Sequence, residues 1–177
     1  MISVYLEAEF SDICSYRMSR KAMAIHMELC SLRSGSTGNA ILARTEKTKI
    51  LIDCGISGKA AFSCLARLDI DPNEIAGVLV THEHSDHTKG IGILARKLQI
   101  PIYANAETWK AMIGSLGKID DAWIKVFATG QEFEIGDIGV RPFAIPHDAA
   151  EPVGYCFDGN GTRAAVATDM GEIWEDV

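Results

Sequence analysis

The sequence has no surplus of basic residues. It holds 17 lysines and arginines against 24 aspartates and glutamates, so its formal net charge is −7 at pH 7. A protein that binds nucleic acid mainly by neutralising its phosphates needs a broad basic surface. The negative net charge argues against that mode of binding. It does not exclude a nuclease, because bound divalent cations reverse the local field where a phosphate docks.

The sequence also lacks any run of about 20 apolar residues, the length that crosses a bilayer. Its first residues show no basic stretch followed by a long apolar core, which is the pattern of a secretory signal. We therefore expect a cytoplasmic protein with no membrane partner. No stable protein partner and no oligomeric state can be inferred from the sequence.

Cysteines are few and scattered. Cys14, Cys30, Cys54, Cys64 and Cys156 are odd in number and include no Cys-x-x-Cys pair. This pattern favours neither a disulfide framework nor a thiolate zinc site, so we expect reduced thiols.

Histidine is scarce as well, yet it is concentrated in one place. Of the five histidines in the chain, three fall within the hexapeptide 82–87, His-Glu-His-Ser-Asp-His. Imidazole nitrogen and carboxylate oxygen are ligands of first-row metals, and a divalent ion bound to them lowers the pKa of a coordinated water. The hexapeptide therefore indicates a metal site for hydrolysis, the alternative being a solvated, histidine-rich turn.

The chain length of 177 residues, 47% of them hydrophobic, suits a single domain with a substantial core. Residues 1–26 show no sustained hydrophobic period, so we expect an amino-terminal extension of uncertain structure in which His26 is incidental. Residues 27–177 alternate between strand-like and helix-like segments, which predicts an α/β layered domain.

The hexapeptide follows a predicted strand over 77–81 and precedes a predicted helix over 88–98. We expect it to lie on the loop between them. Further strands are expected near 29–32, 40–44, 49–53, 102–104, 123–127, 132–135, 140–145, 154–157 and 163–168, and further helices near 56–68 and 107–113.

Other polar residues stand directly after apolar strands. Asp53, His147 and Asp169 each occupy such a strand end. His82 and His84 are two residues apart and can face one centre, while Asp86 and His87 serve a neighbouring one; a carboxylate such as Asp169 can bridge two ions. Local turn or cap roles for the two aspartates, and a plain loop role for the histidine, are the alternatives.

The order of these motifs resembles the metallo-β-lactamase superfamily. The resemblance rests on Asp-Cys-Gly at 53–55, Thr-His-Glu-His-Ser-Asp-His at 81–87, and the strand-end His147 and Asp169. Within that superfamily, the segments 34–40, 87–90 and 146–155 are similar to the YycJ/WalJ-type branch, whose members are described as DNA exonucleases.

This resemblance implies a four-layer αββα sandwich with two divalent metal ions at one edge of its sheets. Zinc or manganese would suit the ligands, and iron is also possible. The implied metal ligands are His82, His84 and His147 for one ion, Asp86 and His87 for the other, and Asp169 as a bridge. Asp86 and Asp53 are the implied catalytic residues, Asp53 as a nearby acid that orients ligands. The implied activity is cleavage of DNA phosphodiester bonds by a hydroxide held on the two ions.

One departure from the family pattern matters. The pattern continues after the bridging aspartate and supplies another histidine ligand, but no histidine follows His147 before the last residue, Val177. We therefore expect a truncated form with an incomplete carboxyl-terminal half, an under-coordinated second ion and an exposed apolar sheet face. Hydrolysis of another ester, thioester or cyclic phosphodiester, and a non-catalytic fragment, are the alternative functions.

Two smaller features are open. The Gly-rich loop 34–39 either binds a phosphate through backbone N–H groups or forms a tight hairpin turn. Glu83, between two predicted ligands, is expected to face solvent or a lysine.

Overall fold

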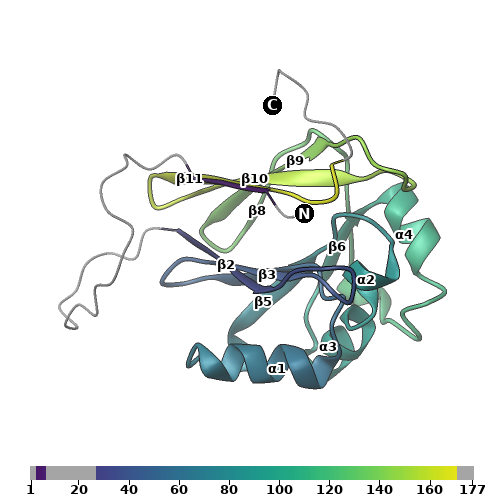
Figure 1. The fold of residues 1–177 in the computed structure, drawn as a ribbon, viewed down its shortest axis with the longest axis horizontal. Coiled ribbons are helices and arrows are strands. Elements are labelled where there is room, and N and C mark those ends of the chain that lie inside the picture. Colours follow the sequence, from purple (N-terminus) through teal and green to yellow (C-terminus); the bar gives the residue numbers. More distant parts are fainter. Residues whose placement is uncertain (1–2, 7–26, 171–177) are drawn as a thin grey trace.

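The computed structural model describes residues 3–6 and 27–170, and two β-sheets face each other in it (Figure 1). The strands are β1 (Ser3–Leu6), β2 (Glu28–Arg33), β3 (Ala40–Arg44), β4 (Lys49–Ile52), β5 (Ile75–Leu79), β6 (Ile102–Asn105), β7 (Ile124–Phe127), β8 (Phe133–Ile135), β9 (Ile138–Ala144), β10 (Val153–Gly159) and β11 (Thr162–Ala167). The helices are α1 (Gly58–Arg67), α2 (Ser85–Thr88), α3 (Ile91–Leu98) and α4 (Ala106–Met112), with 3₁₀ turns η1 (Pro72–Glu74) and η2 (Asp121–Trp123).

The six-stranded sheet has the order β2-β3-β4-β5-β6-β7. Its first three strands are antiparallel, whereas β4 to β7 are parallel and are joined by helical crossovers. Successive side chains of β4 face opposite sides, so Leu51 packs toward the helices while Ile50 and Ile52 pack toward the other sheet. The sheet is thus buried on both faces, and the carboxyl ends of its parallel strands open at one edge.

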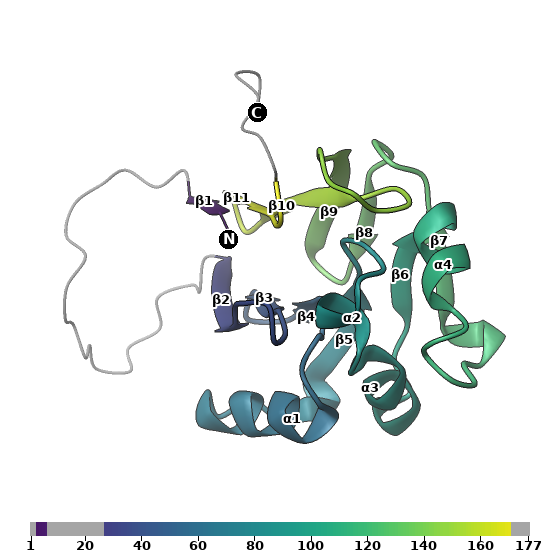
Figure 2. The ribbon, with the colours of Figure 1, turned by 45° about the vertical axis from the view of Figure 1, so that its right-hand side comes forward.

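Helices α1, α3 and α4 cover the outer face of this sheet (Figure 2). Ser57 caps the amino terminus of helix α1, where its side chain accepts a hydrogen bond from the Ala60 N–H at 3.2 Å. The buried face of α1, with Ala61 and Leu65 at helical spacing, packs against the six-stranded sheet. None of the helices among the described residues is long and apolar enough to span a bilayer.

The five-stranded sheet is antiparallel, with the order β1-β11-β10-β9-β8. Strand β1 was not predicted, because four residues are too few to show a period; it pairs with β11 at the edge of the sheet. Asn160 and Gly161 turn the chain between β10 and β11 with φ of 51° and 75°, the left-handed pair of a tight hairpin. The rest of the predicted extension, residues 1–2 and 7–26 with His26, lies outside the described residues.

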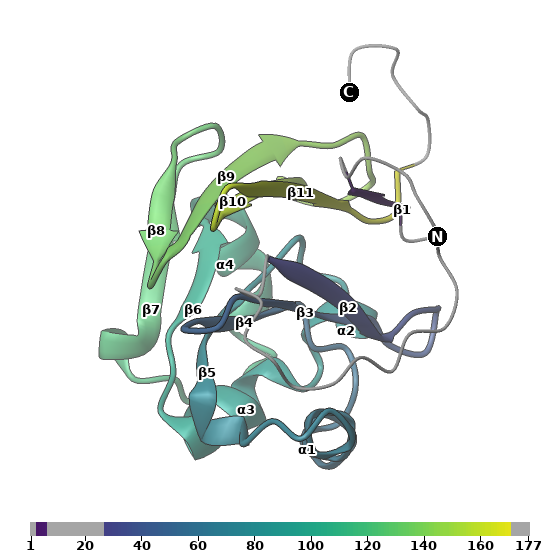
Figure 3. The ribbon, with the colours of Figure 1, turned by 90° about the vertical axis from the view of Figure 1, so that its left-hand side faces the viewer.

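The two sheets stack through a shared apolar core (Figure 3). Tyr155 of β10 is its largest fully buried side chain, and its hydroxyl donates a hydrogen bond to the Val80 carbonyl. Val80 lies two residues before His82, so this bond ties the second sheet to the base of the histidine-rich segment.

The α/β class is confirmed, and the described residues supply three of the four implied layers. The outer face of the five-stranded sheet carries half-buried Phe143 and Cys156 beside exposed Arg141, and no helix among residues 3–6 and 27–170 covers it. The predicted apolar face is therefore mixed rather than uniformly apolar.

The helix predicted over 88–98 is confirmed over Ile91–Leu98, but its expected start is wrong, and the second half of the hexapeptide, expected on a loop, lies in the separate helix α2. Helix α2 ends at Thr88, and α3 begins only at Ile91, with Gly90 between them. A methyl group on Gly90 would lie 2.1 Å from the Ile56 carbonyl oxygen, and its N–H donates to the Cys54 carbonyl at 2.7 Å. The chain is bent by this close approach to residues 54–56, which no local pattern could reveal.

Gly55 makes a still closer approach. A methyl group there would lie 1.5 Å from the Asp86 carbonyl oxygen. Gly55→Ala must push the segment that carries the predicted ligands away from β4, so we expect a loss of about 1–3 kcal/mol of unfolding free energy or more. Urea unfolding measures it. Gly114→Ala is the matched control, because no atom lies within 4 Å of a methyl group there; equal midpoints for the two variants would contradict the packing argument.

Candidate metal centre

The site forms where strands of both sheets end. Asp53 follows β4 and the hexapeptide 82–87 follows β5, while His147 follows β9 and Asp169 follows β11. Asp53 and Asp169 both have left-handed backbone, with φ of 58° and 56°. Aspartate adopts this conformation more readily than most residues, so each strand can turn sharply at its acid.

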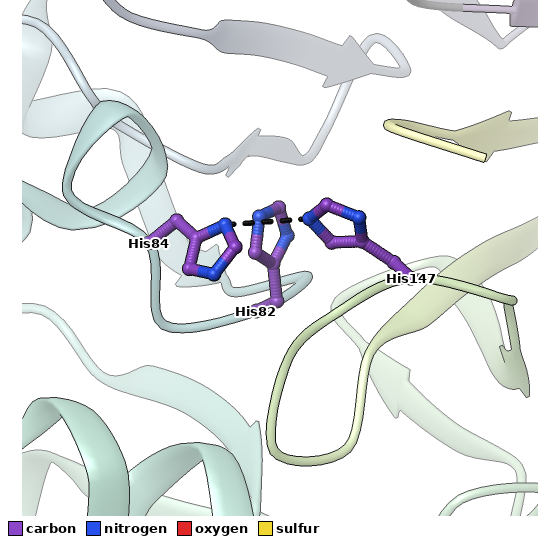
Figure 4. Close-up of side chains that lie close together, drawn as sticks. All are labelled: His82, His84 and His147. Atoms are coloured by element: carbon purple, nitrogen blue, oxygen red, sulfur yellow. Dashed lines mark hydrogen bonds between the residues drawn. The ribbon is translucent and has the colours of Figure 1, made fainter. Parts of the chain in front are cut away.

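The first ligand group consists of His82, His84 and His147 (Figure 4). Each offers one nitrogen, and these nitrogens all lie within 4.8 Å of one another. The His147 Nε2 and His84 Nδ1 atoms are 3.3 Å apart. The ring of His82 stands nearly perpendicular to the other two, at interplanar angles of 80° and 81°. Three imidazoles that converge in this way offer lone pairs to one point.

The second ligand group consists of His82, His87 and Asp169, whose ligand atoms likewise lie within 4.8 Å of one another. The His87 Nε2 and Asp169 Oδ2 atoms are 2.8 Å apart, and Asp86 Oδ2 is 3.7 Å from the same nitrogen. His82, predicted for the first group alone, belongs to both. The structure thus brings all six predicted ligands together, Asp86 through its contact with His87.

The residues present fit a metal ion. His82 Nε2 is buried and has no hydrogen-bond partner among the described residues. A buried polar atom without a partner costs free energy, so its presence calls for an explanation. A divalent cation accepts the lone pair of neutral imidazole, and the carboxylates of Asp86 and Asp169 are suitable companion ligands.

A buried chain of hydrogen bonds fixes two of the imidazoles. Asp53 Oδ1 accepts from the Thr81 N–H at 2.8 Å, and Asp53 Oδ2 accepts from the Thr81 hydroxyl and from His87 Nδ1, both at 2.7 Å. Because the hydroxyl gives its proton to Asp53, it accepts from His82 Nδ1 at 3.0 Å. Both rings therefore carry their Nδ1 proton toward the interior and turn Nε2 toward the other candidate ligands.

This arrangement refines the role of Asp53. Both of its oxygens accept hydrogen bonds from Thr81 or His87, and its side chain is 2% exposed. It contacts the ligands from behind, which suits an orienting acid and not a group that touches substrate. No role was predicted for Thr81. It lies directly before His82 and just after β5, the strand that pairs with the one preceding Asp53, and this place is the signal that would have found it.

The electrostatics of the two imidazoles differ. Burial, helped by the neighbouring His87, lowers the pKa of His82 to about 4, so this ring is neutral at pH 7. Burial also opposes a charge on His87, but the carboxylates of Asp53 and Asp169 outweigh it and raise its pKa. The surroundings of His87 thus favour a positive charge, which a metal ion supplies as well as a proton does.

The expectation for Glu83 is wrong. Its Oε1 accepts a hydrogen bond at 2.9 Å from the Ala150 N–H, and the side chain is half-buried. Ala150 lies three residues after His147, so Glu83 ties the histidine-rich segment to the loop that carries the third imidazole. A contact between residues so distant in sequence, made to a backbone group, leaves no local pattern.

The chain matches one protein-family model and several curated proteins. Residues 48–177 match the family model described as the β-lactamase superfamily domain. The chain is 44% identical over 151 residues to the exodeoxyribonuclease YycJ of Bacillus anthracis, covering 85% of this chain and 56% of that protein. It is 42% identical over 144 residues to the exodeoxyribonuclease WalJ of Streptococcus pneumoniae, covering 80% of this chain and 54% of the relative.

The fold has a solved counterpart. A B3 metallo-β-lactamase with an active-site glutamic acid matches with a TM-score of 0.65 at 22% identity, over 78% of this chain and 58% of that one. The chain thus spans about half the length of the curated relatives that it matches.

Thr81→Val tests the hydrogen-bond chain. The substitution keeps the shape but leaves His82 Nδ1 without an acceptor and Asp53 with one donor fewer. We expect affinity for a divalent ion to fall about 10–100-fold, and the unfolding free energy to fall by about 1–3 kcal/mol. Zinc titration against a chelating dye measures the first effect. Thr81→Ser keeps the hydroxyl and should restore binding; a valine variant that binds like the unaltered protein would refute the assignment.

Proposed function

Because the chain belongs to the β-lactamase superfamily, we propose that it carries the ligand set of a metal-dependent hydrolase that cleaves phosphodiester bonds at the ends of DNA. The observation that carries the proposal is the convergence of five side chains that could hold a metal ion, from segments that follow strands of both sheets, around a buried His82 Nε2 with no partner among the described residues. Asp86 joins them through its contact with His87. Such a cluster of polar side chains suits a bound cation, whereas it does little to stabilise the fold by packing.

The proposal assigns two divalent ions to the site. His82, His84 and His147 would hold one ion, Asp86 and His87 the other, and Asp169 would bridge them. Zinc, manganese and iron all accept imidazole and carboxylate ligands, so the donor set is compatible with each of them. Such ions lower the pKa of a bound water and stabilise the charge that develops on a phosphoryl group.

The residues of the chain have distinct tasks in this proposal. His82 and His87 present Nε2 lone pairs because Asp53 and Thr81 hold their Nδ1 protons. Glu83 holds the loop of His147 in place by its bond to Ala150. These contacts fix the ligand positions before any substrate arrives, so little reorganisation is needed during reaction.

The choice of DNA rests on the relatives, YycJ and WalJ, which are named exodeoxyribonucleases. The net charge of −7 supports recognition at the ion-bearing site over a broad basic surface. A cytoplasmic location is part of the proposal, and the free Cys30, Cys54, Cys64 and Cys156 suit it. Cys14 lies outside the described residues. Hydrolysis of another ester, a thioester or a cyclic phosphodiester by the same ligands is the competing activity.

His82→Ala tests the function. The substitution removes a nitrogen shared by both ligand groups, so we expect release of nucleotides from 5′-phosphorylated linear DNA to fall at least about 100-fold, beyond the effect of losing an outer hydrogen-bond partner. The assay follows acid-soluble nucleotides with zinc or manganese added. Ser85→Ala is the matched control, since Ser85 lies in the same hexapeptide and is exposed.

Two results would contradict the proposal. DNA turnover that survives both His82→Ala and Asp86→Ala would exclude the mechanism. Faster hydrolysis of a thioester than of DNA by the unaltered chain would exclude the substrate.

A further inference from the structure

The Gly-rich loop 34–39 is a tight turn, and three of its six backbone N–H groups donate hydrogen bonds within the protein. The Gly38 N–H donates to the Gly35 carbonyl at 2.9 Å, and the Gly35 N–H donates to Asn39 Oδ1 at 3.0 Å. The Asn39 N–H donates to the Asp86 carbonyl at 2.7 Å. Three of the donors that a phosphate cradle would need are therefore occupied, which favours the hairpin-turn interpretation. The turn places the side chain of Asn39 beside the second ligand group.

The Asn39 side chain is buried, at 5% exposure, against the second ligand group. Its Nδ2 lies 2.9 Å from His87 Nε2 and 3.3 Å from Asp86 Oδ2. Because Oδ1 accepts from Gly35, the orientation of the amide is determined, and the NH₂ group faces the ligands. The Asn39 carbonyl also accepts from the Gly55 N–H at 2.8 Å, so backbone and side chain are both held.

We propose that Asn39 is a positioning residue for the second metal ion. Its NH₂ group donates to Asp86 Oδ2, the carboxylate oxygen that lies 3.7 Å from His87 Nε2, and so holds this oxygen beside the second ligand group. The same group faces the His87 Nε2 lone pair until an ion takes that lone pair over. Asn39 thus orders both ligands of the second group without adding a charge to them. This inference rests on the proposed function, because it presupposes a two-ion site.

The side-chain amide of Asn39 donates a hydrogen bond to the predicted ligands without carrying a charge. Asp86, Asp169 and Asp53 already surround His87 with three carboxylates. A further carboxylate in place of Asn39 would accept rather than donate, and would repel Asp86 until an ion arrived. An aliphatic side chain would leave Asp86 Oδ2 without this donor, and its carboxylate freer to rotate.

The test is a calorimetric titration of the metal-free chain with zinc, and separately with manganese. We expect two binding events in the unaltered chain. In Asn39→Ala the tighter event, at His82, His84 and His147, should keep its affinity and so report an intact fold. The weaker event should lose affinity about 10–100-fold, as is usual when a partner of a metal ligand is removed.

Asn39→Asp separates this role from a purely turn-forming one. It keeps an oxygen that accepts from the Gly35 N–H, so the turn survives, but it replaces the NH₂ group by an oxygen that can itself bind an ion. We expect its second binding event to be tighter than in the unaltered chain. Ser36→Ala and Thr37→Ala, at the exposed tip of the same loop, should leave both events unchanged.

The outcomes distinguish this inference from the proposed function. If the unaltered chain binds no ion, both fail. If it binds two ions and Asn39→Ala binds both as tightly, or if Asn39→Asp matches the unaltered chain, the inference alone fails. An equal loss at both events in Asn39→Ala would also overturn it, because it would indicate a general structural role.

Discussion

A single buried carboxylate, that of Asp53, joins two of the four predicted ligand histidines to the fold, His87 directly and His82 through Thr81. Its side chain is almost completely buried, and an isolated charge in that position would be costly. Three hydrogen bonds stabilise it, from the Thr81 backbone, the Thr81 hydroxyl and His87. The same bonds fix which nitrogen of each imidazole faces the site. The need to satisfy one buried acid therefore determines how the protein presents its metal-binding atoms, His82 included through Thr81.

The fold makes this contact possible by the parallel pairing of β4 with β5, which sets Asp53 beside Thr81. Next to them, the backbone of Gly55 lies so close to the backbone of Asp86 that no side chain would fit at position 55. The second sheet is held by the bond from Tyr155 to Val80. Its strand ends then supply His147 and Asp169. The site is thus a meeting of strand ends that are each held by the core, which accounts for ligands spread over more than 80 positions of the sequence.

The sequence predicted the parts of this site that have local signatures. Two histidines two residues apart, and acids that follow apolar strands, stand out by spacing alone, and the structure brings these residues together. The remaining parts are long-range. The contacts of Asn39 with Asp86 and of Glu83 with Ala150 join residues 47 and 67 positions apart. The break at Gly90 likewise depends on Cys54 and Ile56. Periodicity reports which face of an element is buried, not which distant backbone lies against it.

The central proposal is that the Nε2 atoms of His82 and His87 face a pair of metal ions because Thr81 holds the Nδ1 proton of His82 and Asp53 holds that of His87. A crystal structure of the zinc-loaded chain, with anomalous data at the zinc edge, tests this most directly. The account predicts two anomalous peaks, with His82 Nε2 coordinating one and His87 Nε2 the other, and Asp169 reaching both. The absence of peaks among these residues, or coordination through Nδ1 of either ring, would contradict it.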